Sequence, residues 1–127
     1  MPLVRIDLIK GRSAEQRQAI GEAVYEAMHS IGVPTDDRFE IIAEHDPSDF
    51  IYPRSYLGIE HTDELIVVQI TFNEGRTIER KKALYKAIAE RIHKAIGVRL
   101  SDVFINLVEV KKENWSFGNG VAQYAEP

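Results

Sequence analysis

The sequence contains no cysteine and no run of about 18 apolar residues. The first absence excludes disulfides and thiolate metal sites, and it fits a reducing compartment. The second excludes a transmembrane helix, and no apolar stretch of signal-peptide length opens the chain. Positive charge is not in excess either, because the formal net charge at pH 7 is −4. Together these absences predict a cytoplasmic protein that binds neither nucleic acid nor membranes.

The composition that remains is typical of a globular protein. The chain has 127 residues, and 44% of them are hydrophobic. This length is enough for one domain with a substantial core, and this apolar content argues against disorder. We therefore predict a single domain over residues 1–127.

An internal repeat organises the chain. Gly11-Arg12-Ser13 recurs 64 residues later as Gly75-Arg76-Thr77, and Ile31-Gly32-Val33 recurs 65 residues later as Ile96-Gly97-Val98. Repetition of this kind indicates two copies of one supersecondary unit. We predict two pseudo-repeats at about 2–44 and 66–110. A long connection at 45–65 joins them, and a C-terminal docking tail follows at 111–127.

Each copy is predicted to be a strand, a helix and a strand. In the first copy, Leu3 to Leu8 alternates in polarity, as a half-buried strand does. Ser13 and Gln16 then form a capping-box pattern that begins a helix, and Gly32 ends it. The apolar stripes of the two helices predict their buried faces: Ala19, Ile20, Ala23, Val24, Ala27, Met28 and Ile31, then Leu84, Ala87, Ile88, Ile92 and Ala95. The remaining strands are predicted at Phe39 to Glu44, Ile66 to Phe72 and Val103 to Val110.

The predicted fold class is α+β, with two βαβ pseudo-repeats that form a four-stranded mixed sheet. Parallel strands joined by a helix cross over with right-handed geometry, so both helices lie on one face of the sheet. The other face is too apolar for open water, and we expect an oligomer to cover it. It is predicted to carry Leu3, Arg5, Asp7, Ile42, Val67, Gln69, Thr71, Phe104, Asn106 and Val108.

Two segments lie outside the repeat. The connection 45–65 is rich in aromatic side chains and carries Pro47 and Pro53, and it is either a functional segment or a loop that covers a neighbouring subunit. The tail contains Trp115-Ser116-Phe117-Gly118, and such a density of aromatic residues and glycine predicts a docked segment.

The second residue, Pro2, is a candidate catalyst. Removal of Met1 would leave Pro2 as a free cyclic secondary amine, with a pKa above that of an ordinary α-amino group, about 7.7–8.0. Burial and a nearby cation would lower that pKa, and the amine could then transfer protons near neutrality. The alternative interpretation is a proline that merely precedes a strand.

These features together resemble the tautomerase superfamily, whose catalyst is an amino-terminal proline. Within it, the chain is most similar to the malonate semialdehyde decarboxylase group. The shared stretches are Pro2-Leu3, Asp7-Leu8-Ile9, Gly11-Arg12, Gly32-Val33-Pro34 followed by Asp37-Arg38, and Trp115-Ser116-Phe117-Gly118. The resemblance implies a homotrimer with active sites near the subunit interfaces.

The resemblance also implies roles for individual residues. The group's proline corresponds to Pro2, its aspartate to Asp37, and the second of its two arginines to Arg76. The first arginine has no counterpart, because Asn73 or Glu74 stands in its place.

Each assignment has a structural alternative in the sequence itself. Arg76 repeats Arg12 at the start of a helix, and Asp37 follows Pro34 in a pattern typical of a turn. Trp115 and Phe117 are expected to wall the substrate pocket or to pack the tail, and the two roles are compatible.

The sequence therefore predicts a cofactor-independent keto–enol tautomerase that acts on small oxo carboxylates. One alternative is a decarboxylase or hydratase of 3-oxo acids, like the malonate semialdehyde decarboxylase group. Another is a catalytically silent trimeric binding protein, which would follow if Met1 is retained. No metal or cofactor is expected, because His45 and His61 lack metal-ligand spacing and no phosphate loop or dinucleotide fingerprint is present.

Overall fold

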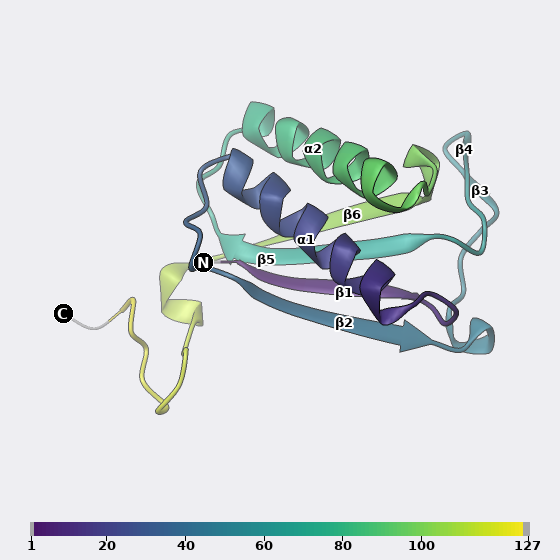
Figure 1. The fold of residues 1–127 in the computed structure, drawn as a ribbon. Helices are drawn as coiled ribbons and strands as arrows, with labels where there is room; N and C mark the ends of the chain where they lie inside the picture. Colours follow the sequence, from purple (N-terminus) through teal and green to yellow (C-terminus); the bar gives the residue numbers. More distant parts are fainter. Residues whose placement is uncertain (1, 126–127) are drawn as a thin grey trace.

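The computed structural model describes residues 2–125. Two long helices lie over one face of a four-stranded sheet (Figure 1). In chain order the helices and strands are β1 (Leu3–Ile9), α1 (Ala14–Ser30), β2 (Phe39–His45), β3 (Ser55–Tyr56), β4 (Ile59–Glu60), β5 (Ile66–Asn73), α2 (Ile78–Ile96) and β6 (Val103–Val110). Three short 3₁₀ turns accompany them: η1 (Pro47–Asp49), η2 (Leu100–Asp102) and η3 (Lys112–Asn114).

The topology of the main sheet confirms the predicted fold class. The strand order is β2-β1-β5-β6, with β1 parallel to β2, β5 parallel to β6, and β1 antiparallel to β5. Each parallel pair is joined by one helix, so each half is a βαβ unit. The boundaries of the pseudo-repeats and of the single domain stay predictions.

Local signals in the sequence set the ends of both helices. Ser13 accepts a hydrogen bond from the backbone of Gln16, whose side chain accepts one from the backbone of Ser13, so the predicted capping box is confirmed. Thr77 caps α2 in the matching place. That helix ends at Gly97, whose φ of 75° lies in the left-handed region that favours glycine.

The core lies between the two helices and the sheet. Alternate residues of β1 and β5 point into it, as the period of a strand requires. The largest fully buried side chains are Phe72, Ile6, Leu8, Ile20, Ile66, Ile70, Leu84, Ile88 and Ile92. This packing fixes which face of each strand is left for other contacts.

Two predicted positions are wrong. Ile42 packs against the core, because it pairs with the buried Ile6 and therefore faces the helices. Ile41, beside Arg5 in the register, occupies the other face instead. Ala95 is exposed, and Ile96 packs against the core in its place. Successive residues of a helix point in different directions, so the last turn directs Ile96 and not Ala95 toward the core.

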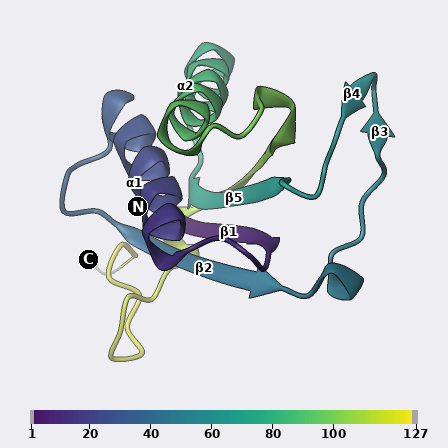
Figure 2. The ribbon, with the colours of Figure 1, turned by 45° about the vertical axis from the view of Figure 1, so that its right-hand side comes forward.

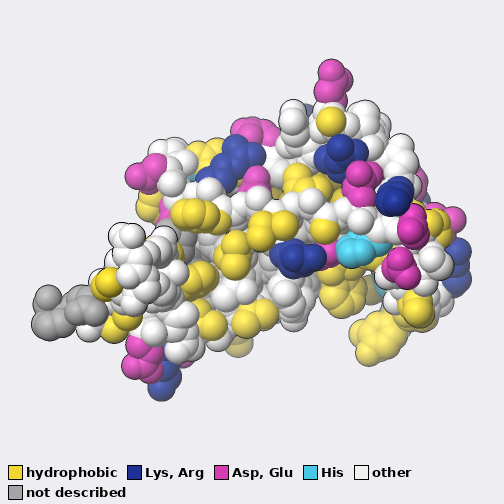
Figure 3. Space-filling view, turned by 90° about the horizontal axis from the view of Figure 1, so that it is seen from below, with side chains coloured by type: hydrophobic (Ala, Val, Ile, Leu, Met, Phe, Trp, Pro, Cys, Tyr) yellow, Lys and Arg dark blue, Asp and Glu magenta, His cyan; other side chains and the backbone are white. Residues whose placement is uncertain are grey.

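The open face of the sheet, which the helices do not cover, is strongly apolar. Figure 3 views the molecule from this side and shows hydrophobic side chains spread across much of the surface. The exposed large hydrophobic residues of its strands are Leu3, Phe39, Ile41, Phe104 and Val108. Exposure on this scale marks an interaction surface.

The connection 45–65 extends away from the sheet and carries the β3–β4 hairpin (Figure 2). Its return to the sheet depends on the buried carboxylate of Asp102. This group accepts hydrogen bonds from the backbone N–H of Thr62 at 2.7 Å and from its hydroxyl at 2.5 Å. Asp102 lies 65 residues after Asp37 and is its counterpart in the repeat, and its burial makes it an anchor for the connection.

We expect Asp102→Ala to lower the free energy of unfolding by about 2–4 kcal/mol, because it leaves two donors of Thr62 without their charged acceptor. Urea denaturation measures this loss, and hydrogen exchange of the Thr62 amide reports the local opening. Asp36→Ala, at an exposed position, is the control and should change stability by less than about 0.5 kcal/mol. Equal stabilities of the two variants would show that Asp102 is not an anchor.

Candidate active site

The register of the sheet brings four distant segments to one edge. Leu3 at the start of β1 lies beside Phe39 at the start of β2 and opposite Thr71 near the end of β5. Thr71 in turn pairs with Val108 near the end of β6. The residues just before β1 and β2 and just after β5 and β6 therefore meet. Figure 1 shows the tail after β6 at this same end of the sheet.

Pro2 is buried at this edge, between two cavities. A very small cavity of about 10 Å³ touches Pro2, Asp37 and Glu40 on the helix side. A larger cavity of about 230 Å³ touches Pro2, Phe39, Trp115 and Phe117. The fold thus brings together Pro2, Asp37, Trp115 and Phe117, four of the five predicted site residues. Met1, whose removal the prediction needs, lies outside the described residues.

The tail closes the larger cavity through an ordered set of contacts. The indole N–H of Trp115 donates to the side-chain oxygen of Asn73 at 2.7 Å. The ring of Trp115 stacks on Phe117 at 5.5 Å between centroids, and Phe117 meets Tyr124 edge to face at 5.0 Å. Aromatic pairs in such geometries stabilise a docked segment.

The fifth predicted residue, Arg76, follows β5 at the same edge and is half-buried. Its guanidinium lies 4.3 Å from the ring centre of Phe72 and donates to the backbone carbonyl of Asn73 at 3.2 Å. Burial lowers the pKa of Arg76 and Arg80 lowers it further, while Glu109 and Asp37 act in the opposite direction. Among the described residues, Arg76 lines neither cavity at Pro2.

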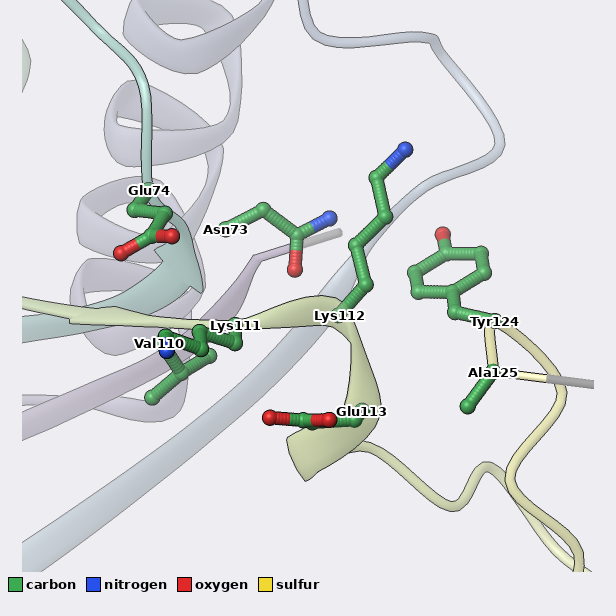
Figure 4. Close-up of a pocket in the computed structure, with 8 residues that line it drawn as sticks. All are labelled: Asn73, Glu74, Val110, Lys111, Lys112, Glu113, Tyr124 and Ala125. Atoms are coloured by element: carbon green, nitrogen blue, oxygen red, sulfur yellow. The ribbon is translucent and has the colours of Figure 1, made fainter.

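The two residues that replace the missing arginine have different surroundings. Asn73 uses its side-chain oxygen to hold Trp115, so it positions the tail. Glu74 is exposed and donates its backbone N–H to Val110 at 2.9 Å. Both residues line a third, open cavity of about 590 Å³, which Figure 4 shows with the first residues after β6.

Comparisons with known proteins show which family the chain resembles. A family model described as "Tautomerase enzyme" matches residues 37–118, and a second model of the same description matches residues 2–54. Probable tautomerase YusQ of Bacillus subtilis (strain 168) is 47% identical over 127 residues, which covers 99% of this chain and 100% of the relative. The chain belongs to the tautomerase family.

Solved structures place this family member more narrowly. It resembles the crystal structure of FG41 malonate semialdehyde decarboxylase inhibited by 3-bromopropiolate, with a TM-score of 0.88 and 43% identity over 98% of this chain and 99% of that chain. A symmetric trimer of wild-type fused 4-OT matches with a TM-score of 0.79 and 25% identity over 98% of this chain and 99% of the other. The predicted likeness to the malonate semialdehyde decarboxylase group is confirmed.

The structure gives roles to three residues for which the sequence analysis predicted none. Asn73 and Tyr124 support the aromatic tail, and Glu40 lies behind Pro2 and Asp37. The density of aromatic residues in the tail is a signal for Tyr124. Nothing in the local sequence marks Glu40, because an acidic residue in a short strand is expected to face water.

Glu40 is unusual because its carboxylate is largely buried. One of its oxygens accepts a hydrogen bond from Nε of Arg38 at 2.9 Å and lies 2.9 Å from Nη2 of the same guanidinium, and the other is buried without a hydrogen-bond partner among the described residues. Burial raises the pKa of Glu40, while Arg38 acts to lower it and Glu22 to raise it. A protonated Glu40 is therefore favoured by folding.

We expect Glu40→Gln to flatten the dependence of stability on pH. The pKa of Glu40 is higher in the folded chain than its ordinary value of about 4.3, so stability falls as pH rises from that value through the folded pKa. One such group contributes at most about 1.4 kcal/mol per pH unit. Chemical denaturation between pH 4 and pH 7 measures the slope. Glu60→Gln, at an exposed position of the β3–β4 hairpin, should keep the wild-type slope, and equal slopes for wild type and Glu40→Gln contradict the assignment.

Two kinds of site are missing from the part of the chain that the structure describes. No group of three or more His, Asp or Glu side chains in residues 2–125 is arranged to hold a metal ion. Over the same residues, neither helix has both the length and the apolar character that a bilayer span requires.

Proposed function

We propose that this member of the tautomerase family is a cofactor-independent keto–enol tautomerase that acts on small oxo carboxylates through the nitrogen of Pro2. The observation that carries this proposal is the burial of Pro2 between Asp37 and the aromatic wall of Trp115 and Phe117. A buried position keeps competing water away from the reacting atoms, and the aromatic wall shapes the space in front of the nitrogen.

In this proposal a neutral Pro2 nitrogen removes a proton from the carbon next to the carbonyl group and returns it elsewhere on the dienol. The guanidinium of Arg76 binds the substrate carboxylate or stabilises the enolate oxygen. Asp37, in the cavity beside Pro2, orients the substrate or a water molecule by hydrogen bonding. Arg76 remains charged throughout, because guanidinium groups are not deprotonated in proteins.

A second candidate is decarboxylation of a 3-oxo acid. It is favoured by the 43% identity to FG41 malonate semialdehyde decarboxylase over nearly the whole chain. In this reaction a protonated Pro2 polarises the carbonyl oxygen while carbon dioxide leaves, and Asp37 assists. The two candidates therefore need opposite charge states of the same nitrogen.

We also propose that the functional unit is a homotrimer. The support comes from the trimeric fused 4-OT neighbours and from the apolar open face of the sheet, which needs a partner. A trimer offers Arg76 two routes to Pro2, within one subunit or across an interface. The predicted cytoplasmic location stays a prediction.

Two measurements test the proposed function. Intact mass spectrometry of the purified protein establishes whether Met1 is removed, and a retained Met1 makes Pro2 an amide nitrogen that cannot act as a base. Rates on phenylenolpyruvate and malonate semialdehyde as a function of pH then separate the candidates, since tautomerisation needs the neutral amine and decarboxylation the protonated one. A processed protein that acts on neither compound would favour the catalytically silent binding protein.

A further inference from the structure

Asp37 lies in a short segment, residues 31–38, that joins α1 to β2. Figure 1 shows this segment descending from the helix layer to the edge of the sheet at which β1 begins. The backbone N–H of Asp37 donates to the carbonyl of Pro34 at 3.2 Å. One carboxylate oxygen of Asp37 is buried, although the neighbouring Asp36 and Arg38 are exposed. A buried carboxylate on so short a connection requires contacts that hold the connection in place.

A single side chain of α1, Tyr25, holds this segment at two points. Its hydroxyl donates to the backbone carbonyl of Thr35 at 2.6 Å. The guanidinium carbon of Arg38 lies 4.4 Å from the centre of its ring, which is the geometry of a cation–π contact. Thr35 and Arg38 stand on either side of Asp37 in the chain, so the two contacts form a staple across that residue. Tyr25 also lines the small cavity that Pro2 and Asp37 share.

Arg38 is itself fixed by carboxylates on two different elements. Its Nε donates to Glu40 of β2 at 2.9 Å, and its Nη1 donates to Glu22 of α1 at 2.9 Å. Hydrogen bonds between charged groups are roughly twice as strong as those between neutral groups. The guanidinium therefore cannot leave the ring of Tyr25 without losing both bonds. The Arg38 half of the staple is held from both sides of the segment.

The internal repeat shows that the staple belongs to the first unit alone. The offsets of 64 within the helix and 65 after it make Ala89 the counterpart of Tyr25 and Val103 the counterpart of Arg38. Neither can form the corresponding contact. The second unit keeps the aspartate as Asp102, but that residue has a different partner. A βαβ unit of this kind therefore forms without the staple, which is present only where the aspartate shares a cavity with the amino-terminal proline.

We propose that Tyr25 is a positioning residue, which holds the carboxylate of Asp37 in place at the Pro2 site. It does so through the staple on Thr35 and Arg38. The inference rests on the proposed function, in which Asp37 orients the substrate or a water molecule. A group that is fixed before the substrate binds requires no ordering during the reaction, and a displacement of about 1 Å can lower the rate by about 100-fold.

A double-mutant cycle with phenylenolpyruvate as the substrate tests the proposal. Tyr25→Phe keeps the ring and removes only the hydroxyl that binds Thr35, and we expect kcat to fall by about 10-fold with little change in KM. In an Asp37→Asn background the same change should lower kcat by less than about 2-fold, because the staple then holds no carboxylate. Tyr85→Phe removes a tyrosine hydroxyl at an exposed position of α2, and this matched control should not change kcat in either background.

The cycle distinguishes positioning from a general structural role. Equal losses in the two backgrounds would show that Tyr25 acts independently of Asp37, and they overturn the proposal. A wild-type kcat in Tyr25→Phe overturns it as well.

Amide hydrogen exchange tests the staple without any turnover. We expect the amide of Asp37, which donates to Pro34 within the segment, to exchange about 2- to 10-fold faster in Tyr25→Phe, the range for one lost hydrogen bond. Tyr85→Phe should exchange at the wild-type rate. If the protein does not act on phenylenolpyruvate, or if Asp37→Asn is too slow to measure, faster exchange retains Tyr25 as the residue that positions Asp37, even where the proposed activity fails. Unchanged exchange overturns the proposal in either case.

Discussion

Replacement of Pro2 by alanine is expected to lower kcat/KM on the accepted oxo acid by about 10²- to 10⁴-fold, the contribution typical of a positioned acid or base. Alanine retains an amino group after removal of Met1, but it loses the ring that directs the nitrogen and makes it a secondary amine. The loss should appear mainly in kcat, because the substrate carboxylate is held elsewhere. Steady-state kinetics on the protein with confirmed mass measure it.

Pro47→Ala is the control for this variant, because Pro47 is exposed in the connection 45–65 and far along the chain from the site. Circular dichroism and the oligomeric state of both variants should match those of the wild type. A fully active Pro2→Ala protein with unchanged structure would exclude Pro2 as the catalyst, and with it the proposed mechanism.

Replacement of Arg76 by alanine is expected to lower kcat/KM by about 10²- to 10³-fold, which is the effect of removing one donor from a developing negative charge. The guanidinium is half-buried and lies over the ring of Phe72, so its position is fixed before substrate binds. Arg76→Lys should recover only part of the activity, since an ammonium group cannot bind a carboxylate through two parallel hydrogen bonds. Steady-state rates of the three proteins test this order.

The internal repeat provides the matched control for Arg76. Arg12 occupies the equivalent place in the first unit, but its guanidinium is paired with Glu64 at 3.3 Å. Arg12→Ala should lower stability modestly and leave kcat/KM close to the wild-type value. Equal losses of activity in Arg12→Ala and Arg76→Ala would indicate that both arginines act on folding and neither on the substrate.

The local signals of the sequence were sufficient for the two helices, the four strands of the main sheet and their arrangement, but not for the β3–β4 hairpin. These signals act over a few residues, so they can be recognised in the sequence without knowledge of the fold. They are the periods of strands and helices, the cap at Ser13 and the glycine at Gly97. The repeat and the handedness of βαβ crossovers then leave few topologies, and the mixed sheet with two helices follows. The strand face that Ile42 occupies was predicted wrongly, because register depends on the partner strand.

The site required more than local signals. Pro2, Asp37, Trp115 and Phe117 were found through resemblance to a family, and only the register of four strands shows why they share one edge of the sheet.

The sequence by itself determined the secondary structure, the repeated unit and the family of this protein, because these depend on patterns along the chain. The tertiary structure alone decided that Glu40 is buried behind Pro2, that Asp102 anchors the connection, and that Asn73 holds Trp115. Each of these depends on contacts between residues far apart in the chain. The burial of a polar side chain and the partner that satisfies it are set by the whole fold, so no short stretch of sequence encodes them.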